Sequence, residues 1–390
     1  MARESCAVIA ITFGPAGVAA LEGENPELGR EVRGRVGDAA RNEGGCHGGR
    51  QADALQRIPF LELGACHDGG FEAGAEVAVH RPHFARCAFE AGCDRLERAG
   101  AGRRLRDPLS QESGHTVLAL ARSDSSEQTL KSAGAEVLRG RLADLDVLRA
   151  GAAQSDGVVS LAFSPGYGSP ERLAAAITEE SAAMAALGEE LIGSDRPIVT
   201  VSGTPWVAGR ASTEEDPLPL EGPVAGRAHS VNALLGLASR GVRATAVRMP
   251  RTVHNEGNGG FAGLLADQAR RTGVAGYPGD GTQRWPAVHA LDAAVLFRLA
   301  LESAPAGTAW HAVADEGDAV GDIATVIGHR LGLPVQPVPQ ENFGPFGPIF
   351  AMDQPASSAR TRDALGWRPT VIVVSVTWLE LVLVTGLDAR

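Results

Sequence analysis

Residues 114–163 alternate short apolar runs with short helical segments, and this alternation constrains the fold more than any other feature. The segment 115–121 is apolar and suits a strand buried on both faces, and further short strands are predicted at 135–138 and 157–163. A brief helical segment ends near Gly134, and a second one covers 145–153. This order of strand, helix, strand, helix and strand predicts an α/β fold with a doubly wound parallel sheet.

The same alternation continues after residue 169. Ser169 and Pro170 suit the start of a long helix, whose apolar side chains recur on one face. These apolar residues are Leu173, Ile177, Met184, Leu187 and Leu191. Further strands are predicted at 198–201 and 244–248, and further helices at 228–240, 261–272, 291–302 and 320–331.

Composition excludes some partners. The net charge of −11 and the isoelectric point near 5.4 argue against nucleic acid or an anionic membrane as the main partner. The first residues show no secretory signal, and the apolar stretch 371–387 is interrupted by Glu380 and too short for a membrane span. All five cysteines lie in the first quarter, and their odd number favours reduced thiols in a cytoplasmic protein.

Residues 1–104 lack the apolar periodicity of the rest of the chain, except at 7–21. That stretch reads as a strand, a glycine turn and a helix start, with Gly14, Gly17 and Ala20 spaced like a loose dinucleotide-binding fingerprint. If it is the first strand and glycine loop, Val8–Ile11 should lie in the sheet beside 115–121, with 22–104 looped out. The alternatives are an ordinary Gly/Ala-rich turn, or an altered start or frameshift that replaced this part of the domain.

Thiol and imidazole side chains between residues 66 and 93 raise the possibility of zinc. They are Cys66, His67, His80, His83, Cys87 and Cys93. Their spacing fits no standard ligand pattern, so the sequence predicts no metal site.

Five segments together carry a family resemblance. They are 114–163, 197–204, 247–254, 285–302 and 357–369. In order and spacing they resemble the extended short-chain dehydrogenase/reductases of the NAD-dependent epimerase/dehydratase family, over about 105–369. The likeness is greatest to an atypical subgroup with degraded catalytic residues.

The resemblance implies a domain organisation. A Rossmann-type NAD(P)-binding domain would cover 105–250 and a smaller substrate-binding subdomain 251–370, after an N-terminal extension at 1–104 and before a divergent tail at 371–390. It also implies a homodimer paired through the helices at 170–191 and 228–240, acting on a small-molecule substrate.

The resemblance also shows what is missing from the catalytic site. The family uses Ser or Thr with a Tyr-x-x-x-Lys pair, in which the lysine lowers the pKa of the phenol. Thr204 takes the Ser/Thr position and Ser202 lies two residues earlier, but Arg227 replaces the tyrosine and Val231 the lysine. Lys131 is the only lysine of the chain, and no Tyr-x-x-x-Lys occurs, which excludes the conventional mechanism.

Other groups near this position could move protons. His229 could replace the phenol, because histidine titrates near neutrality; the alternative is a solvated histidine on a helix. Tyr167 could reach the nicotinamide side, while His254 and His289 suit structural roles. Asp292 matches a family aspartate that mainly secures packing.

The cofactor side of the resemblance predicts NADP rather than NAD. Arg122 and Ser123 follow the strand where NAD-preferring enzymes have an acidic residue, and a cation with a hydroxyl suits a 2′-phosphate. The alternative is a surface arginine in a turn. Arg141 replaces an aspartate that touches adenine in the family, and Leu142 follows it. Leu161, Ala162 and Phe163 would line the nicotinamide ribose through backbone and apolar contact.

These observations favour an NAD(P)-dependent oxidoreductase or epimerase-like protein without the usual Tyr/Lys pair. A non-catalytic NADP-binding regulator or sensor is the alternative. A chain with disturbed ends that binds no dinucleotide is the third possibility.

Overall fold

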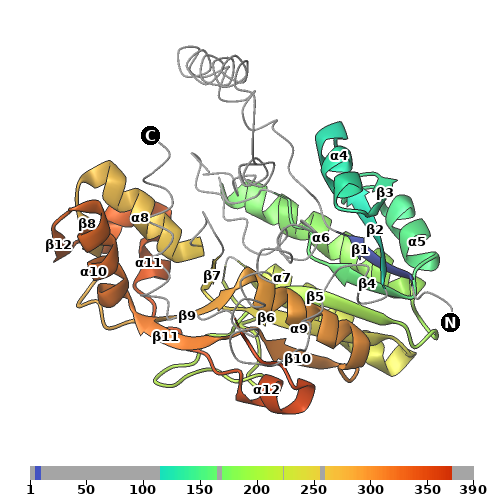
Figure 1. The fold of residues 1–390 in the computed structure, drawn as a ribbon. Helices are drawn as coiled ribbons and strands as arrows, with labels where there is room; N and C mark the ends of the chain where they lie inside the picture. The colour runs from blue at the N-terminus through green and yellow to red at the C-terminus, as the bar shows by residue number, and fades with distance from the viewer. Residues whose placement is uncertain (1–4, 10–114, 165–168, 223, 255–259, 371–390) are drawn as a thin grey trace, which may run out of the picture.

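The main sheet is parallel and doubly wound, as the sequence predicts. The computed structural model describes residues 5–9, 115–164, 169–222, 224–254 and 260–370. Within these residues, seven parallel strands follow the spatial order β10, β6, β5, β4, β1, β2, β3 (Figure 1). Their bounds are β1 (Ser5–Ile9), β2 (Thr116–Ala121), β3 (Glu136–Arg139), β4 (Gly157–Ser160), β5 (Pro197–Gly203), β6 (Arg243–Met249) and β10 (Thr308–His311).

Strand β1 lies inside this sheet, between β2 and β4. Val8 pairs with Ala119 of β2 on one side and with Val159 of β4 on the other, and Ile9 pairs with Ser160. Val8 and Ile9 therefore lie in the sheet where the sequence leads us to expect the first strand. Gly14 and Gly17 lie outside the described residues. So do the apolar tail and every cysteine except Cys6.

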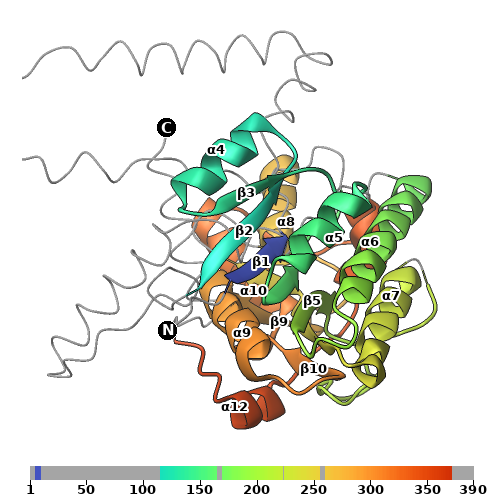
Figure 2. The same cartoon turned by 90° about the vertical axis from the view of Figure 1, so that its right-hand side faces the viewer.

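Both faces of the sheet are buried, because successive apolar residues of each strand point to opposite sides. Ala119 and Ala121 of β2 pack with α4 (Asp124–Ser132) and α9 (Ala290–Ser303), while Leu120 faces the other side. That second side is covered by α5 (Leu145–Ala153), α6 (Pro170–Glu190) and α7 (Ala225–Gly236), which lie together in Figure 2.

Helix α6 begins as expected and packs closely on α7. The Ser169 hydroxyl accepts a hydrogen bond from the Arg172 backbone N–H at 3.3 Å, and Pro170 occupies the first turn. A Cβ atom at Gly226 of α7 would lie 2.6 Å from Cγ2 of Ile177. Glycine at this position therefore lets the two helices approach each other.

A smaller part of the chain gathers at one end of the sheet (Figure 1). Its hydrophobic cluster joins residues of α8, α10 and α11 with Trp285 and Phe343. Its elements are β7 (Thr252–His254), α8 (Gly260–Thr272), β8 (Ala275–Tyr277), β9 (Arg284–His289), β11 (Asp315–Ala319), α10 (Val320–Leu331), β12 (Val335–Pro337), the 3-10 helix η3 (Gln340–Phe346) and α11 (Gly347–Phe350).

The chain returns to the main sheet between these elements. Strand β10 pairs with β6, and α9 packs on the sheet, although both lie within the range 251–370 assigned to the smaller subdomain. Helix α12 (Ala359–Leu365) then packs against α9 and β10. The boundary at residue 250 therefore does not separate the two parts in space, because β10 and α9 follow it in sequence but belong to the main sheet and its covering layer.

Two predicted elements differ in extent. Strand β4 ends at Ser160, so 161–163 continues beyond the sheet as irregular chain. The helix expected at 228–240 begins earlier, at Ala225, and ends in the short 3-10 helix η2 (Leu237–Arg240). None of the helices in the described ranges combines the length and apolar character needed to cross a membrane.

Candidate functional site

The carboxyl ends of β2, β1, β4 and β5 lie side by side, because these strands are parallel neighbours. Arg122 follows β2 directly, and Leu161, Ala162 and Phe163 follow β4. The sheet order changes direction between β1 and β4, which is where ligands bind in doubly wound sheets.

Arg227 faces the end of β4. Its guanidinium carbon lies 4.3 Å from the centroid of the Phe163 ring. Its Nε and Nη2 donate hydrogen bonds of 2.9 and 2.7 Å to the two carboxylate oxygens of Glu180 on α6. The residue in the tyrosine position therefore contacts a residue expected to line the nicotinamide ribose, while an ion pair holds it in place.

Two buried hydroxyls lie at the end of β5. Ser202 and Thr204 are buried, and neither Ser202 Oγ nor Thr204 Oγ1 has a hydrogen-bond partner among the described residues. The backbone of Thr204 is fixed, because its N–H donates to the Met249 carbonyl at 3.0 Å and its carbonyl accepts from Gln354 Nε2 at 2.7 Å. Buried hydroxyls without a partner are unfavourable, so these two are suited to a ligand.

His229 lies on a different face of α7 from Arg227. It is exposed, whereas Ala228 and Ser230 beside it are buried. Residues two apart on a helix are about 200° apart around its axis. The histidine therefore points away from Phe163, and its catalytic role stays a prediction that this geometry does not favour.

The chain matches the family model described as "NAD dependent epimerase/dehydratase family" over residues 101–312. This chain belongs to the NAD-dependent epimerase/dehydratase family. An uncharacterized Schizosaccharomyces pombe protein is 40% identical over 265 residues, which cover 66% of this chain and 88% of that protein. An uncharacterized Saccharomyces cerevisiae protein is 38% identical over 267 residues, which cover 67% and 88%.

Solved structures of this epimerase/dehydratase type share the fold. MoeE5 in complex with UDP-glucose and NAD has a TM-score of 0.56 at 20% identity, and the match covers 72% of this chain and 93% of that one. The UDP-glucose 4-epimerase of Thermus thermophilus in complex with NAD has a TM-score of 0.55 at 18% identity, with 76% and 95% covered. These likenesses confirm the Rossmann-type fold expected from the sequence.

Two residues assigned to the family's cofactor have their side chains engaged elsewhere. The Ser123 hydroxyl caps α4, where it accepts from the Ser126 backbone N–H at 3.2 Å and lies 2.7 Å from Ser126 Oγ. The Leu142 side chain is 2% exposed and packs in the core. A direct contact from either side chain to a cofactor would therefore require it to leave its present partners, and Leu142 can contribute only its backbone.

The remaining residues that the sequence predicts to bind the cofactor lie at the surface or at strand ends. Arg122 is partly buried, and Arg141 is exposed while its backbone N–H donates to the Asp144 carboxylate at 2.8 Å. Leu161 and Ala162 have buried side chains, which leaves their backbone for a ligand, as expected. Tyr167, like Gly14 and Gly17, lies outside the described residues.

His254 and His289 form a buried, uncharged pair. Their rings meet edge to face with centroids 5.3 Å apart. Burial lowers the pKa of His289 to about 4, and burial together with His289 lowers the pKa of His254 well below its ordinary value. His289 Nδ1 accepts the Leu291 backbone N–H at 3.2 Å at the start of α9, so the histidine acts as a helix cap.

Asp292 secures packing, as the family resemblance implies. Its carboxylate accepts the Thr370 backbone N–H at 2.9 Å, and its backbone carbonyl accepts Trp367 Nε1 at 2.9 Å. It is 2% exposed. These bonds tie α9 to the segment after α12.

We expect Asp292→Ala to lower the free energy of unfolding by about 1–3 kcal/mol, because the partly buried hydrogen bond from the Thr370 backbone N–H loses its charged acceptor. Urea unfolding measures the change, and Asp363→Ala provides the control, since Asp363 is exposed on α12. Equal losses in both variants would contradict the assigned role of Asp292.

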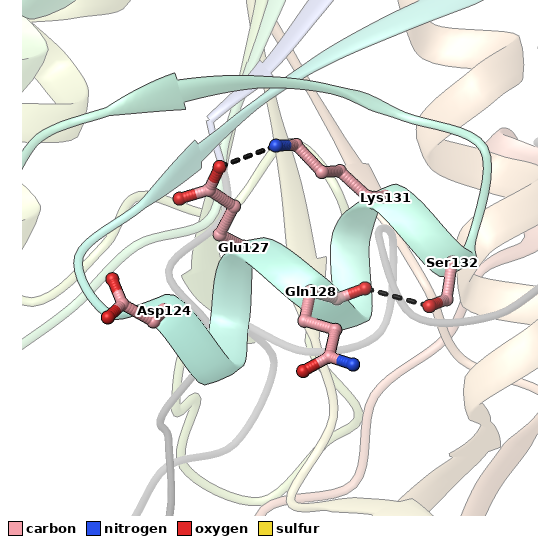
Figure 3. A pocket seen from close by; sticks show the side chains of 5 residues that line it. All are labelled: Asp124, Glu127, Gln128, Lys131 and Ser132. Carbon is pink, nitrogen blue, oxygen red and sulfur yellow. Dashed lines mark hydrogen bonds and ion pairs between the residues drawn. The ribbon is translucent and has the colours of Figure 1, made fainter.

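A surface depression lies along α4. Its lining residues are Asp124, Glu127, Gln128, Lys131 and Ser132 of α4 (Figure 3). Lys131 Nζ donates to Glu127 at 2.6 Å across its wall. None of the lining residues is one that the sequence predicts to bind cofactor or substrate, so we do not assign the depression a function.

Proposed function

We propose that the protein binds NADP at the carboxyl ends of β2, β1 and β4 and acts as an atypical oxidoreductase of the epimerase/dehydratase family. The position of β1 between β2 and β4, where the strand order reverses, carries the proposal. A dinucleotide-binding loop would start from β1. Arg122, after β2, then lies on one side of this loop, and the backbone of 161–163, after β4, lies on the other. The family is NAD-dependent, and the preference for NADP is part of the proposal.

Each residue has a defined task in this proposal. Arg122 provides positive charge for the 2′-phosphate, and Arg141 adds charge nearby. The backbone at Leu161 and Phe163 supports the nicotinamide ribose. When bound, the dinucleotide supplies hydride transfer.

The substrate side relies on the end of β5. The hydroxyls of Ser202 and Thr204, which lack partners among the described residues, orient the substrate by hydrogen bonds. Arg227 contributes fixed positive charge where the family has its tyrosine, which suits stabilising negative charge rather than exchanging a proton. The cytoplasmic location and the homodimer expected from the sequence stay part of this proposal.

The second candidate is an NADP sensor that does not turn over substrate. The Arg227–Glu180 ion pair favours it, because a paired guanidinium replaces the acid/base group of the family. The two functions share the cofactor site and differ only in whether the nicotinamide is oxidised or reduced.

Titration of the purified protein with NADPH, followed by the fluorescence of the reduced nicotinamide, tests the proposal. Saturable binding supports both candidates, and absence of binding overturns both. Oxidation of bound NADPH in the presence of aldehyde or ketone substrates would then favour the oxidoreductase.

Arg122→Asp should weaken NADPH binding about tenfold or more, because a contact to the phosphate becomes a repulsion. NADH has no 2′-phosphate, so its binding should change much less. The same fluorescence titration measures both dissociation constants. Equal losses for the two cofactors would show that Arg122 does not contact the 2′-phosphate.

A further inference from the structure

Two arginines three residues apart, Arg248 and Arg251, have opposite electrostatic surroundings. Arg248 is buried in β6, and its Nη1 donates to the backbone carbonyls of Glu214 and Asp216 at 3.3 and 2.8 Å. Burial lowers the pKa of Arg248, and the carboxylates of Asp216 and Glu214 oppose that change. Its charge is therefore compensated within the protein.

Arg251 has no such compensation. Burial lowers its pKa to about 10, and no carboxylate in the described part of the chain opposes this. Its Nη2 donates to Gln354 Oε1 and lies 3.7 Å from Met352 Sδ, and its guanidinium carbon lies 5.0 Å from the centroid of the Phe261 ring. The buried Nε has no hydrogen-bond partner among the described residues.

The position of Arg251 connects it to the candidate site. It follows β6 directly after Pro250, and Thr204 donates its N–H to the last residue of that strand, Met249. Gln354 bridges the two residues, because it accepts from Arg251 and donates to the Thr204 carbonyl. Arg251 therefore lies at the end of β6, joined through one side chain to the end of β5.

The partly buried Arg251 guanidinium remains charged at neutral pH, since even a pKa of about 10 lies well above 7. An uncompensated charge in such surroundings is unfavourable, and cation–π contact with Phe261 offsets only part of this. An oxyanion would complete the site, because guanidinium geometry matches carboxylate and phosphate oxygens.

We propose that Arg251 binds an anionic group, a carboxylate or a phosphate, carried by the small-molecule substrate. The assignment of this anion to a substrate rests on the proposed function. Binding of the anion itself depends only on the residues around Arg251.

The test measures thermal unfolding of the full chain in sodium phosphate, in sodium acetate and in sodium chloride at equal ionic strength. A bound anion stabilises the folded state, so phosphate or acetate should raise the midpoint above its value in chloride. A larger shift with phosphate indicates a phosphorylated substrate, and a larger shift with acetate indicates a carboxylate.

Arg251→Gln should weaken the fitted anion affinity about tenfold or more. Arg122→Gln should keep the response, which separates this site from the proposed 2′-phosphate contact.

A second pair of variants tests the site without removing the arginine. Met352 is 36% exposed and lies beside Nη2, so Met352→Glu should supply an internal carboxylate that displaces the anion. Its neutral counterpart Met352→Gln should keep the response. The proposal is overturned if chloride stabilises as much as the two oxyanions, or if Arg251→Gln and Met352→Glu respond like the original protein.

NADPH titration of the original protein separates the two proposals. An Arg251-dependent anion response in a protein that does not bind NADPH supports the anion site and overturns the cofactor assignment. NADPH binding without any oxyanion response overturns the anion site and leaves the cofactor assignment in place.

Discussion

Glu180→Leu should lower the free energy of unfolding by about 3 kcal/mol or more, because it removes one partner of a buried ion pair. The Glu180 side chain is 5% exposed and that of Arg227 is 24% exposed, so water screens their attraction poorly. After the substitution the guanidinium stays half-buried beside Phe163 without this carboxylate. Urea unfolding at neutral pH measures the loss.

Two further variants separate the charge effect from packing. Glu180→Leu combined with Arg227→Met should recover much of the loss, since an apolar pair of similar volume can replace a buried ion pair. Asp267→Asn should change stability by less than about 1 kcal/mol, because Asp267 pairs with Arg270 at the surface. A loss for Glu180→Leu as small as that of the surface control would mean that the Glu180–Arg227 pair is effectively solvated.

The fold could be predicted because local pattern and tertiary structure agree. The apolar run of β4 is buried throughout and that of β2 is buried toward its carboxyl end, and the helix bounds 145–153 and 320–331 match α5 and α10. The end of β4 could not be predicted from hydrophobicity. Leu161, Ala162 and Phe163 are as buried as the strand itself, yet their backbone has left the sheet. Apolar character reports burial, whereas strand pairing depends on the neighbouring strand.

The candidate site was predicted in part. The sequence puts Arg227 in the tyrosine position and Phe163 beside the expected cofactor, but neither their contact nor the partner Glu180 was predicted. A signal existed, because Glu180 lies between Ile177 and Met184 at helical spacing and so interrupts the apolar face of α6. An acidic residue on a buried face requires a cation.

Arg251 could not have been found in this way. Its surroundings come from Phe261, Met352 and Gln354, the last of which is more than 100 residues away in sequence. For Ser123 the sequence pattern is visible but ambiguous, because a hydroxyl suited to bind a phosphate is equally suited to cap a helix. Sequence pattern alone does not decide between the two partners.

Acidification should destabilise the protein strongly, with a loss of stability between about pH 6.5 and pH 4. Burial lowers the pKa of both His289 and His311 to about 4, and burial also lowers that of His254 well below its ordinary 6.5. In this interval the unfolded chain binds protons that the folded chain does not, so stability falls as pH falls. Each lowered pKa of this size makes acidification from neutral pH to about pH 4 cost about 3 kcal/mol of stability, because protonation favours the unfolded chain.

An opposing change comes from Asp315, whose pKa burial raises to about 6, with Asp318 adding to the rise. A raised carboxyl pKa disfavours the folded state at neutral pH, and this penalty is relieved as the group protonates below pH 6. Asp315 is only partly buried, so water screens the effect and the histidines dominate the profile.

His289→Asn tests the histidine contribution with little change in structure. Asparagine is a favourable helix cap, so it can accept the Leu291 N–H in place of His289 Nδ1 without titrating. At pH 7 the variant should be within about 1 kcal/mol of the original protein, since Asn replaces a neutral cap. Between pH 7 and pH 4 it should lose about 3 kcal/mol less, measured by urea unfolding at each pH. An identical loss in both proteins would mean that His289 is protonated in the folded state as readily as in the unfolded chain. In that case the His289 ring must be accessible to water, although it is buried at the start of α9.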